Sequence, residues 1–234
     1  MKRLTILTLI IAAMLIIASN VFAASYSGSL SEGIGTITAT DRYDRSSSPY
    51  LNIAYNVVDN NNGTWTYNYS LNRPTGKENG KTAPGVSHFI LETSAAFKLS
   101  DIIGDVNVEG VVYNPLTSGK VILGDWGDEG GSNPNIPAIL HGLKFDIGGA
   151  DNDYAYTISF TSLRMPVLGD FYVKGGLADA WNSGFTANDL DFNLLNHIYV
   201  PDTKTNNTPV PEPSSLIGMI VLLPSAVLLF KKRK

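Results

Sequence analysis

Residues 51–71 read LNIAYNVVDNNNGTWTYNYSL, and this stretch decides the fold class. Apolar side chains occupy every second position from Leu51 to Val57 and again from Trp65 to Leu71. The cluster DNNNG, residues 59–63, separates the two runs and consists of residues that favour turns. Alternation, β-branched and aromatic content, and a central turn together predict a β-hairpin with one face inward and an Asn/Thr face toward water.

The same period-two pattern recurs along the chain, and clusters of Gly, Asn, Asp and Pro separate the segments. Further strands are expected at Gly35–Asp41, Val86–Thr93, Val106–Tyr113, Lys120–Leu123, Ile139–Ile147, Tyr154–Leu163, Gly169–Lys174 and His197–Val200. Leu99–Ile103 and Leu177–Trp181 are expected to be single helical turns. Because no crossover helix is evident, the prediction is all-β: an antiparallel β-sandwich, jelly-roll-like or immunoglobulin-like, over residues 24–200.

Composition limits the function classes. The chain has 234 residues, a formal net charge of -4 and no cysteine. Without cysteine the chain has no disulfide, thiolate metal site or cysteine nucleophile. The acidic balance argues against nucleic acid as a partner, because that partner requires a basic face.

The N-terminal residues 1–23 have the parts of a secretory signal peptide. Lys2 and Arg3 precede an apolar run from Leu4 to Ala18, and the stretch ends on small residues at Val21 and Ala23. This order predicts recognition by signal peptidase and cleavage between Ala23 and Ala24. An N-terminal membrane anchor is the alternative.

The C-terminal part combines a linker, a short motif, an apolar stretch and a basic end. Residues 201–209 form the linker, Val210-Pro211-Glu212-Pro213 follows, and an apolar stretch precedes Lys231-Lys232-Arg233-Lys234. A single transmembrane helix over 214–230 is expected, with the basic end in the cytoplasm. The two prolines keep the peptide around Glu212 extended, a form that a processing enzyme can bind.

Residues 210–234 resemble the PEP-CTERM sorting signal of Gram-negative bacteria. The resemblance implies that an exosortase, a membrane-embedded processing enzyme, recognises Val210, Pro211, Glu212 and Pro213 and cuts near them. It also implies a bacterium that makes an exopolysaccharide matrix. Short segments around Ser87–Glu92, Gly169–Gly176 and Ala180–Phe185 are similar to segments of uncharacterised PEP-CTERM ectodomains. A plain tail anchor is the alternative interpretation.

Two acidic, glycine-rich loops are weak candidates for calcium, which binds six to eight oxygen ligands in irregular geometry. The first contains Asp125 and Asp128, and the second contains Asp151 and Asp153. Ordinary solvated turns are the simpler interpretation, and no other cofactor is expected.

Catalytic patterns are sparse. The three histidines, His88, His141 and His197, lack the spacing of a zinc site, and no Gly-x-Ser-x-Gly motif occurs. A carbohydrate-binding platform would need exposed aromatic rings, and Tyr43, Tyr50, Trp126 and Trp181 lie beside turn signals. Rings in such positions more often cover the ends of a sandwich core, and this is the favoured interpretation.

The sequence therefore predicts an exported, non-enzymatic cell-envelope or matrix protein associated with exopolysaccharide. Its precursor would be anchored in the inner membrane before it reaches the cell surface or the medium. The alternatives are a carbohydrate- or calcium-binding adhesion module and a secreted hydrolase. Between Ala24 and Phe230, 11 basic residues face 21 acidic ones, so this segment carries 11 − 21 = −10.

Overall fold

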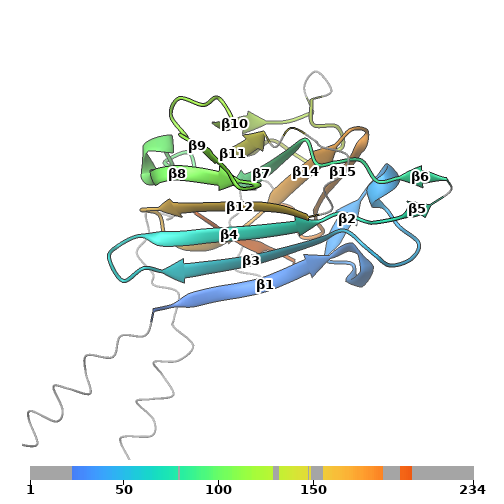
Figure 1. The fold of residues 1–234 in the computed structure, drawn as a ribbon, viewed down its shortest axis with the longest axis horizontal. Helices are drawn as coiled ribbons and strands as arrows, with labels where there is room; N and C mark the ends of the chain where they lie inside the picture. The colour runs from blue at the N-terminus through green and yellow to red at the C-terminus, as the bar shows by residue number, and fades with distance from the viewer. Residues whose placement is uncertain are drawn as a thin grey trace, which may run out of the picture. The chain divides into compact units, whose positions relative to one another are not determined.

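Two six-stranded antiparallel sheets form the fold in the computed structural model (Figure 1), which describes residues 23–78, 80–128, 132–146, 148, 155–186 and 196–201. Sheet A contains, in spatial order, β1 (Ser25–Ser31), β3 (Asn52–Asp59), β4 (Trp65–Asn72), β12 (Ala155–Ser162), β8 (Ile102–Val108) and β9 (Val111–Tyr113). Sheet B contains β10 (Val121–Trp126), β11 (Leu140–Asp146), β7 (His88–Glu92), β14 (Phe171–Gly175), β15 (Ala178–Asn182) and β2 (Ile37–Ala39). The all-β, antiparallel prediction is confirmed.

Smaller elements complete the described part of the chain. β13 (Pro166–Gly169) pairs with β16 (Ile198–Pro201), and β5 (Lys77–Glu78) pairs with β6 (Lys81–Thr82). Three short 3-10 turns, η1 (Glu32–Ile34), η2 (Asp41–Tyr43) and η3 (Leu99–Asp101), connect strands. The helical turn expected at Leu99–Ile103 is confirmed in this 3-10 form. Within the described residues no helix is long and apolar enough to cross a membrane.

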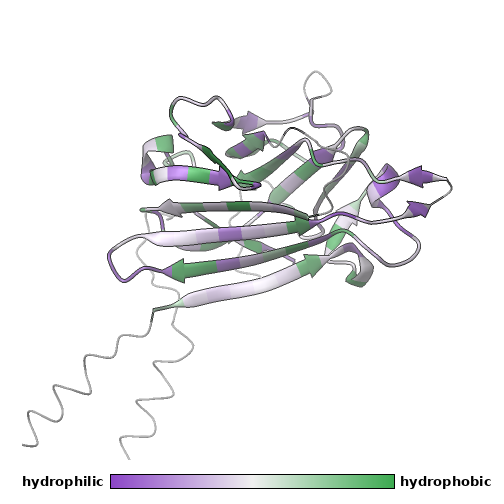
Figure 2. Cartoon of the chain, viewed as in Figure 1, coloured by the Kyte–Doolittle hydropathy of each residue, from purple (hydrophilic) through white to green (hydrophobic). Residues whose placement is uncertain are grey.

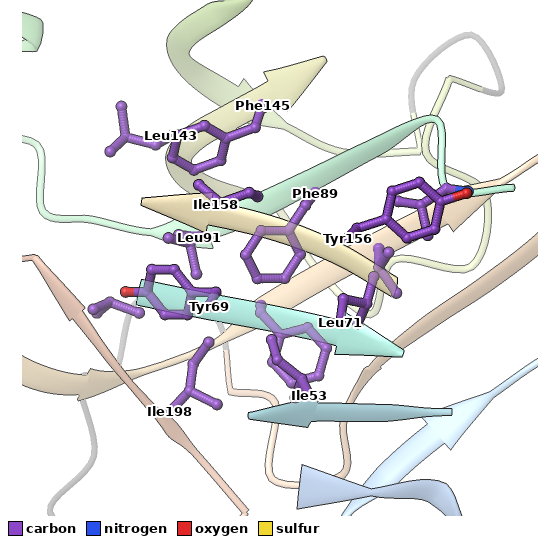
Figure 3. Close-up of a cluster of buried hydrophobic side chains, with 14 of the residues drawn as sticks. Ile53, Tyr69, Leu71, Phe89, Leu91, Leu143, Phe145, Tyr156, Ile158 and Ile198 are labelled. Atoms are coloured by element: carbon purple, nitrogen blue, oxygen red, sulfur yellow. The ribbon is translucent and has the colours of Figure 1, made fainter. Parts of the chain in front are cut away.

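The two sheets share one hydrophobic core, which makes the arrangement a β-sandwich. Figure 3 shows Phe89 of β7 among side chains of the facing sheet, including Tyr69 and Leu71 of β4. Phe89 is 1% exposed, and its ring lies 5.9 Å from that of Tyr69 and 6.4 Å from that of Phe145. Burying such a side chain contributes about 1.5–3 kcal/mol, so a core this size stabilises the domain without disulfides.

The hairpin predicted from residues 51–71 is confirmed. β3 and β4 pair antiparallel with Ile53 opposite Leu71 and Val57 opposite Tyr67, all four buried in the shared core. Because side chains alternate in a strand, this register directs the large apolar residues of the hairpin inward and its Asn, Ser and Thr residues outward, together with Ala54 and Val58.

Two expectations about local structure were wrong. The single strand expected at Val106–Tyr113 is a hairpin, because Glu109 (φ 54°) and Gly110 (φ 77°) are both left-handed and form a two-residue turn between β8 and β9. The helical turn expected at Leu177–Trp181 is strand β15. Its small residues Ala178 and Ala180 are fully buried and pack into the core, so tertiary packing overrides local helix preference.

One strand is shorter than expected. Only Ile37–Ala39 of the predicted Gly35–Asp41 segment forms a strand, because Gly35 (φ 73°) and Asp41 (φ 48°) adopt left-handed backbone at its two ends. Residues 1–22 of the signal peptide expected at 1–23 and the transmembrane helix expected at 214–230 lie outside the described residues.

Candidate functional site

The predicted processing sites fall at or beyond the ends of the described chain. Val210, Pro211, Glu212 and Pro213 lie outside the described residues. Ala23 is exposed, whereas the carbonyl oxygen of Ala24 accepts a hydrogen bond from the backbone N–H of Asp59 at 2.9 Å. The expected cleavage bond therefore joins an exposed residue to the first residue held by the fold.

The calcium candidates are only partly described. The side chain of Asp125 is 72% exposed, and its Oδ1 lies 2.6 Å from Nδ1 of His141. Asp128 is exposed, and Asp151 and Asp153 lie outside the described residues. In the described part of the chain, no group of three or more His, Asp or Glu side chains could hold a metal ion.

The three histidines each face a different partner. Nε2 of His88 lies 2.9 Å from Oδ1 of Asn133, and Nε2 of His197 lies 3.4 Å from Oδ1 of Asp170. His141 pairs with Asp125. Burial, followed by the nearby charge of Lys144, lowers the pKa of His88 to about 4, so His88 is neutral at pH 7.

The nearest approach to a hydrolase arrangement lies at one end of sheet B. Asp125 and His141 are opposite one another in the ladder, and the backbone N–H of Thr93 bonds to the carbonyl of His141. A nucleophile requires a hydrogen bond to its base. Here Oγ1 of Thr93 and Nε2 of His141 are buried with no hydrogen-bond partner, so the required contact is not formed.

Two buried carboxylates in the same region connect strand ends. Asp170 is fully buried; its Oδ1 accepts a hydrogen bond from Nδ2 of Asn182 at 2.6 Å, and its Oδ2 accepts one from the backbone N–H of Thr186 at 2.9 Å. Oε2 of Glu92 accepts from the backbone N–H of Asp170 at 2.8 Å. Glu92 is 4% exposed. Both acids are thus committed to backbone and amide donors that join β7, β14 and β15.

The four aromatic rings considered for a carbohydrate platform do not form one exposed surface. Tyr43 is fully buried, and its hydroxyl donates to the carbonyl of Pro84 at 3.3 Å. Tyr50 is half-buried. Trp126 and Trp181 pack against a second apolar cluster, and the indole N–H of Trp126 donates to the carbonyl of Gly142 at 2.9 Å. Tyr43, Trp126 and Trp181 serve packing, as the favoured interpretation expected, and Tyr43 is not exposed as a platform ring would have to be.

The middle of the outer face of sheet B, which carries this second cluster, is covered. The cluster consists of Ile90, Ile136, Leu140 and Tyr172. Residues of the 127–139 connection are tied onto it. The Tyr172 hydroxyl donates to the carbonyl of Pro134 at 2.8 Å, and Nζ of Lys174 donates to that of Ser132 at 2.8 Å. The middle of this face is therefore part of the packed fold.

The outer face of sheet A is different in kind. Strands β1, β3, β4 and β12 are in register, so their outward side chains form four rows of four, called here the polar grid. The rows are Ser31–Asn52–Asn72–Ala155, Ser29–Ala54–Ser70–Thr157, Ser27–Asn56–Asn68–Ser159 and Ser25–Val58–Thr66–Thr161. Thirteen of the sixteen are Ser, Thr or Asn, and none is charged, aromatic or fully buried.

Hydrogen bonds between neighbouring strands hold several grid side chains in place. Oγ of Ser159 donates to Oδ1 of Asn68 at 2.8 Å, and Oγ of Ser25 donates to Oδ1 of Asn56 at 3.2 Å. The hydroxyls of Thr66 and Thr161 lie 3.3 Å apart. Hydroxyl and carboxamide groups both donate and accept, so the grid presents an ordered set of neutral donors and acceptors.

Sequence reasoning found only part of this surface. The Asn/Thr face of β3 and β4 was predicted, but β1 was missed because its sequence SYSGSLS reads as a loop by composition. In Figure 2 β1 is drawn mostly in pale colours, since Ser, Gly and Tyr have intermediate hydropathy. The available signal was the serine at every second position from Ser25 to Ser31.

Comparison of the chain with protein-family models, with curated proteins and with solved structures finds no match.

Proposed function

We propose that the chain is an exported, non-enzymatic protein of the cell envelope or extracellular matrix, sorted through a PEP-CTERM/exosortase pathway and associated with exopolysaccharide. The sorting part of the proposal rests on the order of segments at the two ends of the sequence. Signal peptidase would act between Ala23 and Ala24, and an exosortase would act near Pro211-Glu212-Pro213. Until then the precursor would be anchored in the inner membrane.

The observation that carries the polysaccharide part is the polar grid. A neutral polysaccharide offers hydroxyl groups and no charge, and it binds by exchanging hydrogen bonds with water for hydrogen bonds with protein. The grid supplies neutral donors and acceptors without a charged side chain that would hold its own hydration shell. Its side chains are already ordered by one another, which lowers the entropy cost of binding.

Charge favours a neutral polymer over an acidic one. The segment from Ala24 to Phe230 carries −10, so a polyuronate would be repelled by the domain as a whole. The contacts expected are weak individually and additive along a polymer, which suits a matrix protein that meets many repeats of the same ligand.

Among sandwich classes we favour the jelly-roll-like one. Along the chain the core strands β4, β7, β8, β11, β12 and β14 alternate between sheet A and sheet B. Jelly rolls place successive strands in opposite sheets in this way.

Affinity electrophoresis tests the polysaccharide part. Full-length protein in mild detergent would run in native gels containing dextran, galactomannan or alginate. We expect retardation in at least one neutral polymer and none in alginate. Ser70→Glu, which places a charge inside the grid, should abolish the retardation, whereas Thr38→Glu, an exposed strand position on sheet B, should not. No retardation in either neutral polymer, or equal loss in both variants, would overturn the assignment of this surface.

A further inference from the structure

The two sheets have four edge strands, and three of them carry features that discourage pairing with another chain. β9 and β2 have three residues each, and β10 contains Asp125. β1 has seven residues, no charge, no proline and an uninterrupted register with β3. Within the described residues no strand pairs with its other side. Natural proteins usually have short, charged or distorted strands at such an edge, because unpaired backbone groups there can form hydrogen bonds with a strand of another chain.

The backbone groups that β1 leaves free can be assigned by parity. Antiparallel pairing uses the N–H and C=O of every second residue. The carbonyl of Ala24 bonds to Asp59 of β3, so the even residues of β1 face β3. Odd residues therefore face outward. Consistent with this, the N–H of Ser31 donates to Oγ1 of Thr36 at 2.8 Å, and its carbonyl accepts from the Thr36 N–H at 3.1 Å.

Thr36 thus occupies the outward backbone groups of Ser31 at one end of the edge. The outward N–H and C=O groups of Ser25, Ser27 and Ser29 remain available for pairing. The sequence of β1, SYSGSLS, is nearly symmetric about Gly28. Reversed along a second copy, it places serine opposite serine on the outer face. On the inner face it places Tyr26 opposite Leu30, an aromatic–aliphatic pair of the kind that stabilises neighbouring strands.

We propose that β1 is a self-association edge, which pairs antiparallel with β1 of a second copy of this chain about a two-fold axis at Gly28. In this register Ser27 of one copy lies opposite Ser29 of the other, and both have outward N–H and C=O groups. The two symmetric Ser27–Ser29 pairs then form four backbone hydrogen bonds. Gly28 lies opposite Gly28 at a position that makes none, as the alternation of antiparallel pairs requires.

Charge explains why the copies would meet at this edge. Two segments that each carry −10 repel one another overall. The opposite edge region of sheet A carries Asp105 and Glu109, and the edge strand β10 of sheet B carries Asp125. The side chains of β1 carry no charge, and neither do the outward side chains of β3 next to it. Electrostatic repulsion between two copies is therefore smallest along the β1 edge. Pairing there would also join the polar grids of two copies, although it does not depend on what the grids bind.

Disulfide trapping in the full chain tests the register, because the protein has no cysteine of its own. Ser27→Cys and Ser29→Cys chains, purified separately in detergent, would be mixed and oxidised. Opposed residues in a bonded pair are about 5.5 Å apart at Cα, within the range of a disulfide. We expect several-fold more covalent dimer in the mixture than in either variant alone, and none above background for Thr117→Cys, which is an exposed loop position.

A second pair of variants tests the edge independently. Ser27→Pro removes an outward N–H that the β3 ladder does not use, so the fold should remain while pairing is lost. Ser27→Ala keeps that N–H and should self-associate like the wild type. Sedimentation velocity gives the mass, and circular dichroism verifies the fold. A monomeric wild type at tens of micromolar, dimers that survive Ser27→Pro, or stronger trapping by Ser27→Cys alone would each overturn the proposal.

Discussion

The outer faces of the two sheets have opposite designs. On sheet B, Tyr172 is fully buried on the outward side of its strand, His88 is 7% exposed, and both are hydrogen-bonded to the 127–139 connection. On sheet A, the outward positions of four adjacent strands carry small uncharged side chains, and none of them is fully buried. The same architecture therefore uses one outer face as an additional core and leaves the other to solvent or a partner.

This difference matters for stability and for binding. Residues beneath the 127–139 connection contribute through burial, so changes there should lower the free energy of unfolding. Residues of the polar grid bury little, and changes there should alter recognition while leaving stability nearly constant.

Truncating the centre of the covered face should have the largest effect. Tyr172→Ala removes a ring packed against Ile90, Ile136 and Leu140, together with its hydrogen bond to Pro134. We expect a loss of about 3–5 kcal/mol in the free energy of unfolding by urea titration. The matched outward change on sheet A, Ser70→Ala, should stay within about 0.5 kcal/mol. Comparable losses for the two variants would contradict the contrast.

The second-largest loss of stability should come from lowering the pH, through His88 on the covered face. The pKa of His88 is lowered to about 4 from an ordinary value of 6.5. Between these two pH values the unfolded chain binds the proton and the folded chain does not, so stability falls as the pH drops through that window. The loss attributable to His88 is about 3 kcal/mol at 1.36 kcal/mol per pKa unit.

Thermal unfolding from pH 7 to pH 4 measures this slope. In His88→Gln the amide cannot titrate, so the part of the slope above pH 4 that His88 supplies should disappear. An identical slope in the variant would contradict the assignment of this loss to His88. Asp179 cannot supply it, because burial raises the pKa of its carboxyl, so the folded chain binds that proton first and gains stability on acidification.

Releasing the connection should have an intermediate effect. Asn133 is 2% exposed; its Oδ1 contacts His88, and its Nδ2 donates to the carbonyl of Gly127 at 3.2 Å. Asn133→Ala leaves those buried groups unpaired, at a cost of about 1–3 kcal/mol. Iodide should then quench Trp126 more strongly than in the wild type. Asn68→Ala, from the grid, is the matched amide deletion, and we expect no change in quenching.

The smallest thermodynamic effect belongs to a charge placed in the grid. Ser70→Glu has no buried partner to disturb and should change the melting temperature by no more than about 2–4 °C. The same variant should lose polysaccharide retardation. A large fall in melting temperature would show that the grid contributes to stability, against the contrast drawn between the two outer faces.

Sequence patterns predicted the parts of the fold in which the local signals agree. The hairpin of β3 and β4 has alternation, aromatic content and a turn cluster, and its register follows from them. β1 was missed because serine and glycine are weak strand formers, and its pairing depends on β3. β15 was misread because alanines favour helix, and only the packing of Ala178 and Ala180 between neighbours makes it a strand.

Only the β3 and β4 part of the polar grid was predictable from the sequence. Asn68 and Ser70 lie on a face that alternation identifies as polar, but the grid exists only because β1 and β12 join that face in register. Such juxtapositions depend on long-range pairing that a single sequence does not reveal. The same applies to the pairing of His141 with Asp125, which lie 16 residues apart on neighbouring strands.

The intact mass and the cellular fraction of the mature form test whether this polar sandwich is exported and processed at both ends. Wild-type protein should begin at Ala24, lose mass from its C-terminal part near Pro211-Glu212-Pro213, and leave the inner membrane. Glu212→Ala should retain the C-terminal part and remain in the inner-membrane fraction, while Thr208→Ala should behave as wild type. A Glu212→Ala chain with the wild-type mass and location would rule out sorting through Pro211-Glu212-Pro213.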